Sequence, residues 1–485
     1  MVFSINSGNN DDIRIRQAGV AGSFYPDNPI ELRNMIETFL SQTKKTNLPG
    51  LVMGLVSPHA GYIYSGHVAA NGYKLLSNRE INRVIVISPS HVASFLGAAV
   101  YNGDAYETPL GQVLIDKEFS ERLAQGNSLI KLSSDGHETV RQGRMEHALE
   151  VQLPFLQCTL GNFQLVAIIM GDQSYATCRA LGMELAKSIN DEHTVIIASS
   201  DLSHFHEYAD ASRRDKSLIH AIDEWDYFNL SRNIKSRQWE ACGGGPIVAA
   251  MIACENLKAG NSRVLKYANS GDVPAGSKSQ VVGYTSIAFY EDKSSKSNKS
   301  KEFRLSTDEQ KYLLQIAKQT VQTAVEKGKI LDCNSGGYDA LAVDRGAFVT
   351  LIKSENLRGC IGYTSPVKPL CETVRDVAIS AALKDPRFPA VTPGELDELS
   401  YEISVLSPFR KVIDLNQIQI GTHGLLIKYG RSEGLLLPQV ATDNNWDRET
   451  FLASNCRKAG LPMDTWKDPE ADIFMFSAFV FGDKH

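Results

Sequence analysis

The chain has 485 residues, which is too long for one ordinary core, so we expect two or three domains. Its formal charge of -6 argues against the basic surface of a nucleic-acid-binding protein, and we expect no nucleic-acid partner. Residues 1–19 contain no apolar segment typical of a secretory signal, and the longest apolar runs are too short to span a membrane. The chain has eight cysteines and no C-x-x-C pair. Together, these features favour a cytoplasmic protein with reduced thiols and no membrane partner.

Short apolar runs alternate with helical patterns through the first half of the chain. The apolar runs lack the in-and-out alternation of a half-exposed sheet, and they cover 51–57, 84–88, 164–170, 194–199 and 281–290. Amphipathic stretches cover 30–43, 66–77 and 176–190. This order predicts an α/β domain with a mostly parallel sheet flanked by helices. In such sheets, ligands bind beyond the carboxyl ends of the strands.

Three of these predicted strands lead directly into turns that carry chemistry-bearing residues. "LVMGLVSPH" ends at His59, "VIVISPSH" ends at His91, and "TVIIASSDLSH" carries Asp201 and His204. Imidazoles and carboxylates are common ligands of Fe, Zn and Cu, so the four residues suggest a metal site at one sheet edge. Each residue alone also fits a hydrogen-bonded histidine or, for Asp201, a helix cap.

Cys242 lies in "ACGGGPIVAAMIACENL", a glycine-rich turn that leads into an apolar helix. A thiol beside a helix N-terminus is favoured as the thiolate, which can attack or bind metal. The glycines would also allow a ligand to approach the backbone closely. A small buried thiol beside a flexible loop is the alternative.

Other polar residues of this half are candidates for contact with a substrate. In "MEHALEVQLPFLQ", His147 and Glu150 are three residues apart and would share one face of a predicted helix over 145–157. Tyr62 follows His59 closely in "SPHAGYIYSG" and could contact an aromatic or anionic substrate. Alternatively, His147 and Glu150 lie on a solvated helix face, and Tyr62 packs in the core.

A linker divides the chain. From Asp292 to Lys301 the sequence consists almost wholly of Ser, Lys and Asn. We therefore predict a first domain over 12–291, a linker over 292–303 and an unrelated second domain over 304–485. In the second, Ser306 would cap a helix over 307–327, with further helices at 367–384 and 448–458. Predicted strands at 346–352, 399–407, 424–430 and 434–441 complete an α+β domain.

The stretch "LRGCIGY" (357–363) is the main candidate site of the second domain. Cys360 on a glycine turn beside Arg358 could be a nucleophile of lowered pKa, and Arg358 could face a substrate. His423 is the only histidine in the body of the domain that could serve as its base. A small residue packed at a tight turn is the alternative. "GRSEG" (430–434) matches G-x-S-x-G, but its flanking sequence predicts a hairpin loop rather than a nucleophile elbow.

The motifs "SPHAGYIYSG", "SPSH", "MEHALEVQLPFL", "SSDLSHF" and "CGGGP", in this order, resemble the Memo family. That family is similar to class III extradiol dioxygenases of the LigB-like α/β fold. The resemblance implies a metal site of His59, His91 and Cys242, with Asp201 and His204 completing the pocket. Fe(II) is the expected metal, with Cu or Zn as alternatives. A thiol replaces the carboxylate of the dioxygenases, which puts ring cleavage in doubt.

The strings "LRGCIG", "DPRFP", "LSYEISVLSPF" and "GTHGLLI" resemble the AMMECR family over 304–485. The resemblance implies an α+β domain with its functional site at Arg358–Gly362, but it supplies no settled activity. The combination of the two domains resembles the AmmeMemoRadiSam grouping, which implies a radical-SAM protein as a partner.

These observations lead to two hypotheses. In the first, the chain is a metal-dependent oxidoreductase acting on a small, aromatic molecule, with Asp201, His204 and Cys360 as catalytic residues. In the second, it is a non-catalytic binding or scaffold protein that recognises an anionic or phosphorylated partner, with "CGGGP" as an anion-binding turn. The oligomeric state stays open.

Overall fold

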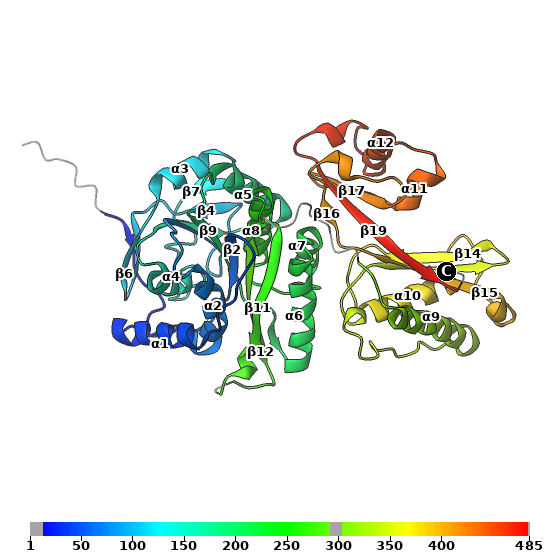
Figure 1. Cartoon of the computed structure of the whole chain (residues 1–485), viewed down its shortest axis with the longest axis horizontal. Coiled ribbons are helices and arrows are strands. Elements are labelled where there is room, and N and C mark those ends of the chain that lie inside the picture. The colour runs from blue at the N-terminus through cyan, green and yellow to red at the C-terminus, as the bar shows by residue number, and fades with distance from the viewer. Residues whose placement is uncertain (1–12, 275, 292–302, 484–485) are drawn as a thin grey trace, which may run out of the picture. The chain divides into compact units, whose positions relative to one another are not determined.

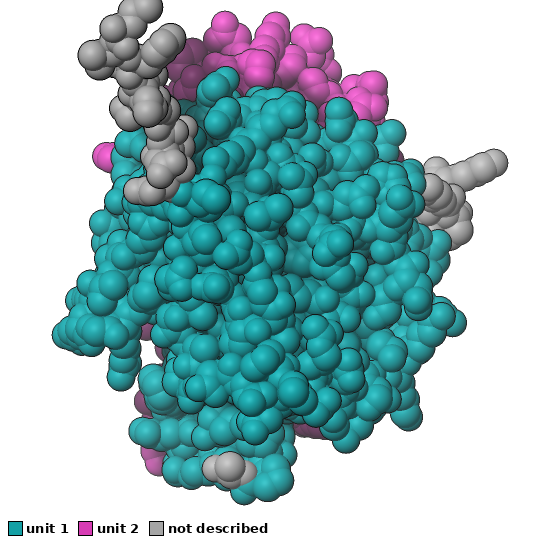
Figure 2. Space-filling model, turned by 90° about the vertical axis from the view of Figure 1, so that its left-hand side faces the viewer, with its two compact units in different colours: residues 1–223, 230–294 teal, residues 224–229, 295–485 magenta. Residues whose placement is uncertain are grey.

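The computed structural model groups the chain into two compact units, coloured separately in Figure 2. The first contains the chain up to Asp223 and from Leu230 to Ser294, and the second contains Glu224–Asn229 and the chain from Ser295 onwards. The structure describes residues 13–274, 276–291 and 303–483.

The predicted domain boundaries, 12–291 and 304–485, place residues 224–229 in the first domain, whereas these residues group with the second unit. The predicted linker over 292–303 lies outside the described residues except for its last position. No helix within the described part of the chain is long and apolar enough to cross a membrane.

Nine strands form the main sheet of the first unit (Figure 1). They are β2 (Val52–Ser57), β3 (Arg83–Pro89), β4 (Ala98–Val100), β7 (Ile130–Leu132), β8 (Gln164–Met170), β9 (Thr194–Ser199), β10 (His204–His206), β11 (Asn261–Asn269) and β12 (Val281–Tyr290). Their order is β10-β12-β2-β9-β3-β8-β4-β7, with β11 also paired to β12. A smaller sheet consists of β1 (Ile15–Arg16), β5 (Ala105–Thr108) and β6 (Gly111–Leu114).

The central strands β2, β9, β3 and β8 are parallel, which confirms the α/β architecture. Their residues are buried along almost their whole length because helices cover both faces, as continuous apolar runs require. Toward its edges the sheet also contains antiparallel pairs, since β12 and β4 run antiparallel to their neighbours β2 and β8. β11 and β12 follow one another along the chain and pair antiparallel.

Helices flank the main sheet on both faces. In chain order they are α1 (Pro29–Gln42), α2 (Tyr62–Leu76), α3 (Lys117–Gln125), α4 (Leu153–Leu160), α5 (Tyr175–Ser188), α6 (Tyr208–Asp223) and α8 (Gly244–Asn256). Helix α7 (Tyr227–Lys235) begins among the residues that group with the second unit. Leu32 of α1, Tyr73 of α2 and Phe155 of α4 share one core with Val84 and Val86 of β3. Side chains alternate along β3, so α8, which also contacts β3 and packs on α5, covers the opposite face.

The second unit is an antiparallel sheet with helices on two parts of its surface. Its strands are β13 (Ala347–Lys353), β14 (Asn356–Tyr363), β15 (Leu399–Leu406), β16 (Arg410–Lys411), β17 (His423–Tyr429), β18 (Ser432–Leu436) and β19 (Asp472–Gly482). Its helices are α9 (Thr307–Lys327), α10 (Leu370–Leu383), α11 (Pro438–Asp443) and α12 (Arg448–Lys458). The order is β14-β13-β15-β19-β17-β18, with β16 paired to β19.

The long strand β19 joins two cores of this unit, because Phe481 packs with α9 and α10 whereas Ile473 packs with α12. The α+β prediction is confirmed, as is the capping box of Ser306 and Glu309 at the start of α9. Two local predictions were wrong. "LRGCIGY" is strand β14 and not a turn, and the predicted strand at 434–441 ends at Leu436, after which Pro438 begins α11.

A buried histidine of the first unit is fixed in its neutral form. His137 is fully buried, its Nε2 donates to the Ala99 carbonyl at 3.0 Å, and its Nδ1 accepts from the Tyr106 hydroxyl at 2.5 Å. Burial, assisted by the nearby Arg16 charge, lowers the pKa of His137 to about 4. Protonating Nδ1 would also leave two donors facing each other.

We expect the first unit to lose stability as the pH falls through this range. Below about pH 6.5 the unfolded histidine binds a proton that the folded protein does not accept until about pH 4. Relative to neutral pH, His137 should therefore lower the free energy of unfolding by about 2 kcal/mol at about pH 5. Urea denaturation should show a smaller loss for His137→Gln than for wild type and for the control His193→Gln, an exposed histidine. Equal losses in all three would contradict the prediction.

Candidate metal centre

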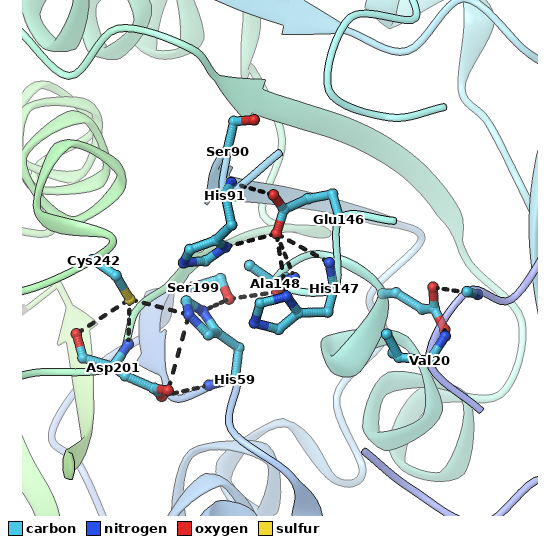
Figure 3. Close-up of polar contacts among 12 residues, drawn as sticks. Val20, His59, Ser90, His91, Glu146, His147, Ala148, Ser199, Asp201 and Cys242 are labelled. Atoms are coloured by element: carbon cyan, nitrogen blue, oxygen red, sulfur yellow. Dashed lines mark hydrogen bonds and ion pairs between the residues drawn. The ribbon is translucent and has the colours of Figure 1, made fainter. Parts of the chain in front are cut away.

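Three of the predicted turns meet at one edge of the main sheet. The strands β2 and β3 both pair with β9 and are in register across its residue Ala198. His59, His91 and Asp201 each lie two residues beyond the end of their strand. Because parallel strands end at the same edge, these side chains come together there, as Figure 3 shows.

The protonation of the His59 ring follows from its hydrogen bonds. Its Nδ1 lies 2.9 Å from the Ser199 hydroxyl, which itself lies 2.6 Å from the Ala148 carbonyl and 2.7 Å from the Gln152 amide nitrogen. A carbonyl only accepts, so the single Ser199 proton goes to Ala148, and His59 Nδ1 must donate to Ser199. The lone pair of His59 is therefore on Nε2, which lies 3.0 Å from Cys242 Sγ.

The glycine run brings the Cys242 loop close to the end of β9. A Cβ on Gly243 would lie 2.1 Å from the Ser199 carbonyl, so only glycine fits this approach. Cys242 Sγ accepts from the backbone N–H of Asp201 at 3.2 Å. The Gln173 amide donates to the Cys242 carbonyl at 2.8 Å and accepts from the first turn of α8. The glycines thus serve close packing within the chain, whereas the sequence had suggested approach by a ligand.

The Cys242 thiol is neutral in the metal-free protein, contrary to the thiolate expected beside a helix N-terminus. Burial raises its pKa strongly, and the negative charge of Asp201 adds to the effect. These two contributions outweigh the N–H donors around the sulfur. The S–H proton can then point at the His59 lone pair.

Glu146, which the sequence analysis missed, holds the His91 side of the cluster. Its carboxylate accepts from the backbone N–H and from Nδ1 of His91, the latter at 2.9 Å, and from the N–H groups of His147 and Ala148 at 3.0 Å each. Although burial opposes ionisation, these contacts lower the pKa of Glu146 to about 2. Burial alone would lower the pKa of His91, but the hydrogen bond and the charge of Glu146 outweigh this effect and raise it. The contact leaves His91 Nε2 directed away from Glu146.

His147 also belongs to the cluster. Its ring stacks on His91 with centroids 4.7 Å apart and meets the edge of His59 at 5.4 Å. Burial lowers the pKa of His147 to about 3, and the charges of the other two histidines contribute. His147 is therefore a neutral imidazole at physiological pH.

Asp201 and His204 border the three histidines. The Asp201 carboxylate accepts from the backbone N–H groups of His59 and Ala60, at 2.8 and 3.3 Å, and lies 4.0 Å from His59 Nε2. Burial raises the pKa of Asp201, whereas the nearby His204 lowers it. Asp201 caps no helix, since β10 follows it. His204 begins β10 and is half-buried.

Two predicted substrate-facing residues lie elsewhere. Tyr62 is buried in the core against Tyr25, and its hydroxyl donates to the Val151 carbonyl at 2.7 Å. Glu150 is fully buried, forms an ion pair with Arg16 and accepts from Tyr25 at 2.5 Å. The helical spacing used for Glu150 does not apply, because helical structure begins only at Glu150 itself.

The described residues contain two groups of side chains whose ligand atoms lie within 4.8 Å of one another. One is His59, His91 and Cys242, and the other is His91, Glu146 and His147. Imidazole nitrogen and cysteine sulfur are donors for Fe, Cu and Zn. Both His59 and His91 have Nδ1 fixed by a hydrogen-bond acceptor and Nε2 available, which is the usual arrangement of metal-binding histidines.

The sequence matches two family models, Memo-like protein over residues 16–288 and AMMECR1 over residues 314–481. A MEMO1 family protein of Nitrosopumilus maritimus is 36% identical over 281 residues, covering 57% of this chain and 99% of the relative. The chain belongs to the Memo family. A MEMO1 family protein of Methanocaldococcus jannaschii is 37% identical over 290 residues, covering 56% of this chain and 98% of the relative. The solved structure of uncharacterized protein PH0010 from Pyrococcus horikoshii is 35% identical with a TM-score of 0.35, covering 38% of this chain and 95% of that one.

In the AMMECR1 domain, the strings "RGCIG" and "DPRFP" meet around the backbone of Cys360. The Cys360 N–H donates to the Asp385 carboxylate at 2.8 Å, and Arg387 donates to the Cys360 carbonyl at 3.0 Å. The Arg387 guanidinium holds the pKa of Asp385 well below its usual range. Among the bonds described, Cys360 Sγ accepts from the Thr350 hydroxyl at 3.4 Å. The reactivity of this thiol stays a prediction.

Arg358 is paired with Glu395, and His423 lies on a distant strand of the sheet. Arg358 forms two hydrogen bonds to Glu395, at 3.0 and 3.1 Å, and donates to the Pro389 carbonyl at 2.9 Å. His423 begins β17, which three strands separate from β14, so at the usual strand spacing it lies about 19 Å away across the sheet. "GRSEG" joins β17 to β18 as a hairpin, as predicted.

Gly359 lets β14 lie directly on α10. A Cβ at this position would be 2.2 Å from the Ala381 carbonyl, a backbone atom that cannot move away cheaply. We expect Gly359→Ala to destabilise the Memo-family chain by about 1–3 kcal/mol through overpacking in its AMMECR1 domain. Gly394→Ala, where a Cβ meets nothing within 4 Å, should change stability by less than this. Thermal or urea denaturation of both variants provides the comparison, and equal effects would contradict the packing argument.

Proposed function

We propose that this chain is a metal-dependent oxidoreductase whose Memo domain binds Fe(II) through His59, His91 and Cys242. The observation that carries the proposal is the convergence of these three ligand atoms within 4.8 Å at the carboxyl edge of the sheet. Two histidines with one anionic ligand resemble the triad of non-haem iron enzymes, which leaves further positions open. Bound Fe(II) would supply one-electron redox chemistry at these positions, and Cu or Zn would suit the same donors.

The surrounding residues fix the donors before any metal binds. Ser199 and Glu146 set the tautomers of His59 and His91, so that Nε2 of each ring is the free donor. The Asp201 N–H directed at Cys242 Sγ favours the thiolate that a metal requires. Binding would therefore displace the thiol proton rather than rearrange the side chains.

Asp201 and His204 are the groups through which protons would move. The Asp201 carboxylate lies 4.0 Å from His59 Nε2, whereas the His204 ring is half-buried and so partly open to solvent. We further propose a small, aromatic substrate at the centre. In the same proposal, the AMMECR1 domain delivers or modifies the substrate through Cys360, and a radical-SAM protein is the partner that the domain combination implies.

Metal analysis tests the centre directly. The full chain, purified anaerobically and supplied with Fe(II), should retain about one equivalent of metal, and His91→Ala should lose most of it. Substitution with Co(II) should give a sulfur-to-metal charge-transfer band that disappears in Cys242→Ser. Oxygen consumption with a panel of small aromatics that includes catechols then tests turnover.

The exposed His193 gives a matched control, since His193→Ala removes a histidine of the same unit and should leave the metal content unchanged. A wild-type chain without stoichiometric metal would overturn the proposal. That result would instead favour the second hypothesis, in which the protein binds an anionic or phosphorylated partner without turnover.

Glu146→Gln tests whether this carboxylate supports metal binding through His91. The variant keeps every ligand but removes the charge that orients His91 and places an amide N–H against its backbone donors. We expect a loss of metal affinity of about 10- to 100-fold, measured by competition with a chelating dye. Glu118→Gln, at a side chain that is 93% exposed, should retain wild-type affinity. An unchanged affinity of Glu146→Gln would show that the carboxylate does not orient the histidine.

A further inference from the structure

Phe205 combines two features that are rare in one aromatic residue. Its backbone has φ +62°, in the left-handed region, and its side chain is 68% exposed. Bulky residues adopt this conformation at a cost in free energy, and an exposed benzyl group gains nothing from burial in return. Neither feature therefore stabilises the fold.

A β-bulge between β10 and β12 imposes this conformation. His204 pairs with Val282 and His206 pairs with Val281, so Phe205 is an extra residue with no partner on β12. Bulge positions in the left-handed region usually hold glycine. Here a large aromatic side chain takes the place of glycine and projects into solvent.

Both sides of the bulge are anchored. Before it, the Ser203 N–H donates to the Asp215 carboxylate at 2.9 Å. After it, the His206 ring bonds to the Glu240 carboxylate at 2.9 Å. These contacts fix the backbone on each side of Phe205 and so sustain its strained conformation.

The same contacts place Phe205 beside the metal centre. Its ring meets the His204 ring with centroids 5.7 Å apart, and His204 follows Asp201 by three residues. On the other side, Glu240 lies two residues before Cys242. The bulge therefore connects the Asp201 end of the cluster to the Cys242 loop, with Phe205 exposed between them.

We propose that Phe205 is a specificity-determining residue of the centre, whose exposed ring stacks on a planar aromatic substrate. The proposal rests on the proposed function and names the surface that selects its substrate. Stacking would remove water from both rings and adds an attraction beyond the buried area. The anchored bulge keeps the ring in place before binding, which lowers the entropic cost of association.

The test measures binding of 4-nitrocatechol to the anaerobic, Fe(II)-loaded full chain by difference absorbance. Phe205→Gly should weaken binding by about 3- to 10-fold, whereas Phe205→Tyr should bind within about twofold of wild type. The metal content of both variants should equal that of wild type. Phe205→Gly should melt no lower than wild type, because glycine accepts the left-handed conformation without strain.

Lys258→Gly is the matched control. Lys258 is exposed, has φ +63° and follows the far end of α8 from Cys242. Its replacement should leave affinity for the catechol unchanged. Unchanged affinity in Phe205→Gly would overturn the proposal, as would a parallel loss of metal, which would assign Phe205 a structural role. A wild-type chain that binds metal but not the catechol would also overturn the proposed role of Phe205, although the proposed metal site would still hold. A wild-type chain that binds no metal would overturn the proposed function itself.

Discussion

The arrangement of the centre depends on one buried carboxylate. Glu146 is 1% exposed and accepts four N–H donors, two from His91 and one each from His147 and Ala148. A buried negative charge is tolerable only when such donors replace its hydration. The carboxylate thereby ties the end of β3 to the segment before α4, and both the His91 and His147 rings take their positions from this bond network.

The same segment sets the protonation state on the opposite side of the cluster. Ala148 donates its N–H to Glu146 and accepts the Ser199 proton at its carbonyl, which leaves Ser199 as the acceptor for His59. The His59 lone pair then faces Cys242. A continuous set of hydrogen bonds thus fixes the proton positions from Glu146 to Cys242. Arg16 holds the backbone of Glu146 in place by donating to its carbonyl.

Local sequence patterns predicted the residues whose positions depend on local structure. His59 and His91 immediately follow buried strands, so the apolar runs alone place them at the sheet edge. Glu146 could not be predicted in this way, because its segment is not helical and is held by Arg16, which lies far away in the sequence. The same reason explains why the segment around Cys360 was wrongly predicted as a turn. Gly359 suggests a turn locally, but it lies in strand β14, where its lack of a side chain allows close packing against Ala381, which is distant in the sequence.

The metal-free cluster also explains how a half-buried thiol can exist beside a buried carboxylate. The Cys242 thiol stays protonated, so no second negative charge lies next to Asp201. Its proton can face the lone pair of His59 Nε2, which lies 3.0 Å from Cys242 Sγ. A divalent cation would replace that proton and use the same lone pair and the same sulfur. The surrounding hydrogen bonds to Ser199, Glu146 and the Asp201 N–H are compatible with both states, because none of them uses the donor electrons of either Nε2 atom. The same hydrogen bonds can therefore hold these side chains in place with either a thiol proton or a metal ion between Cys242 Sγ and His59 Nε2.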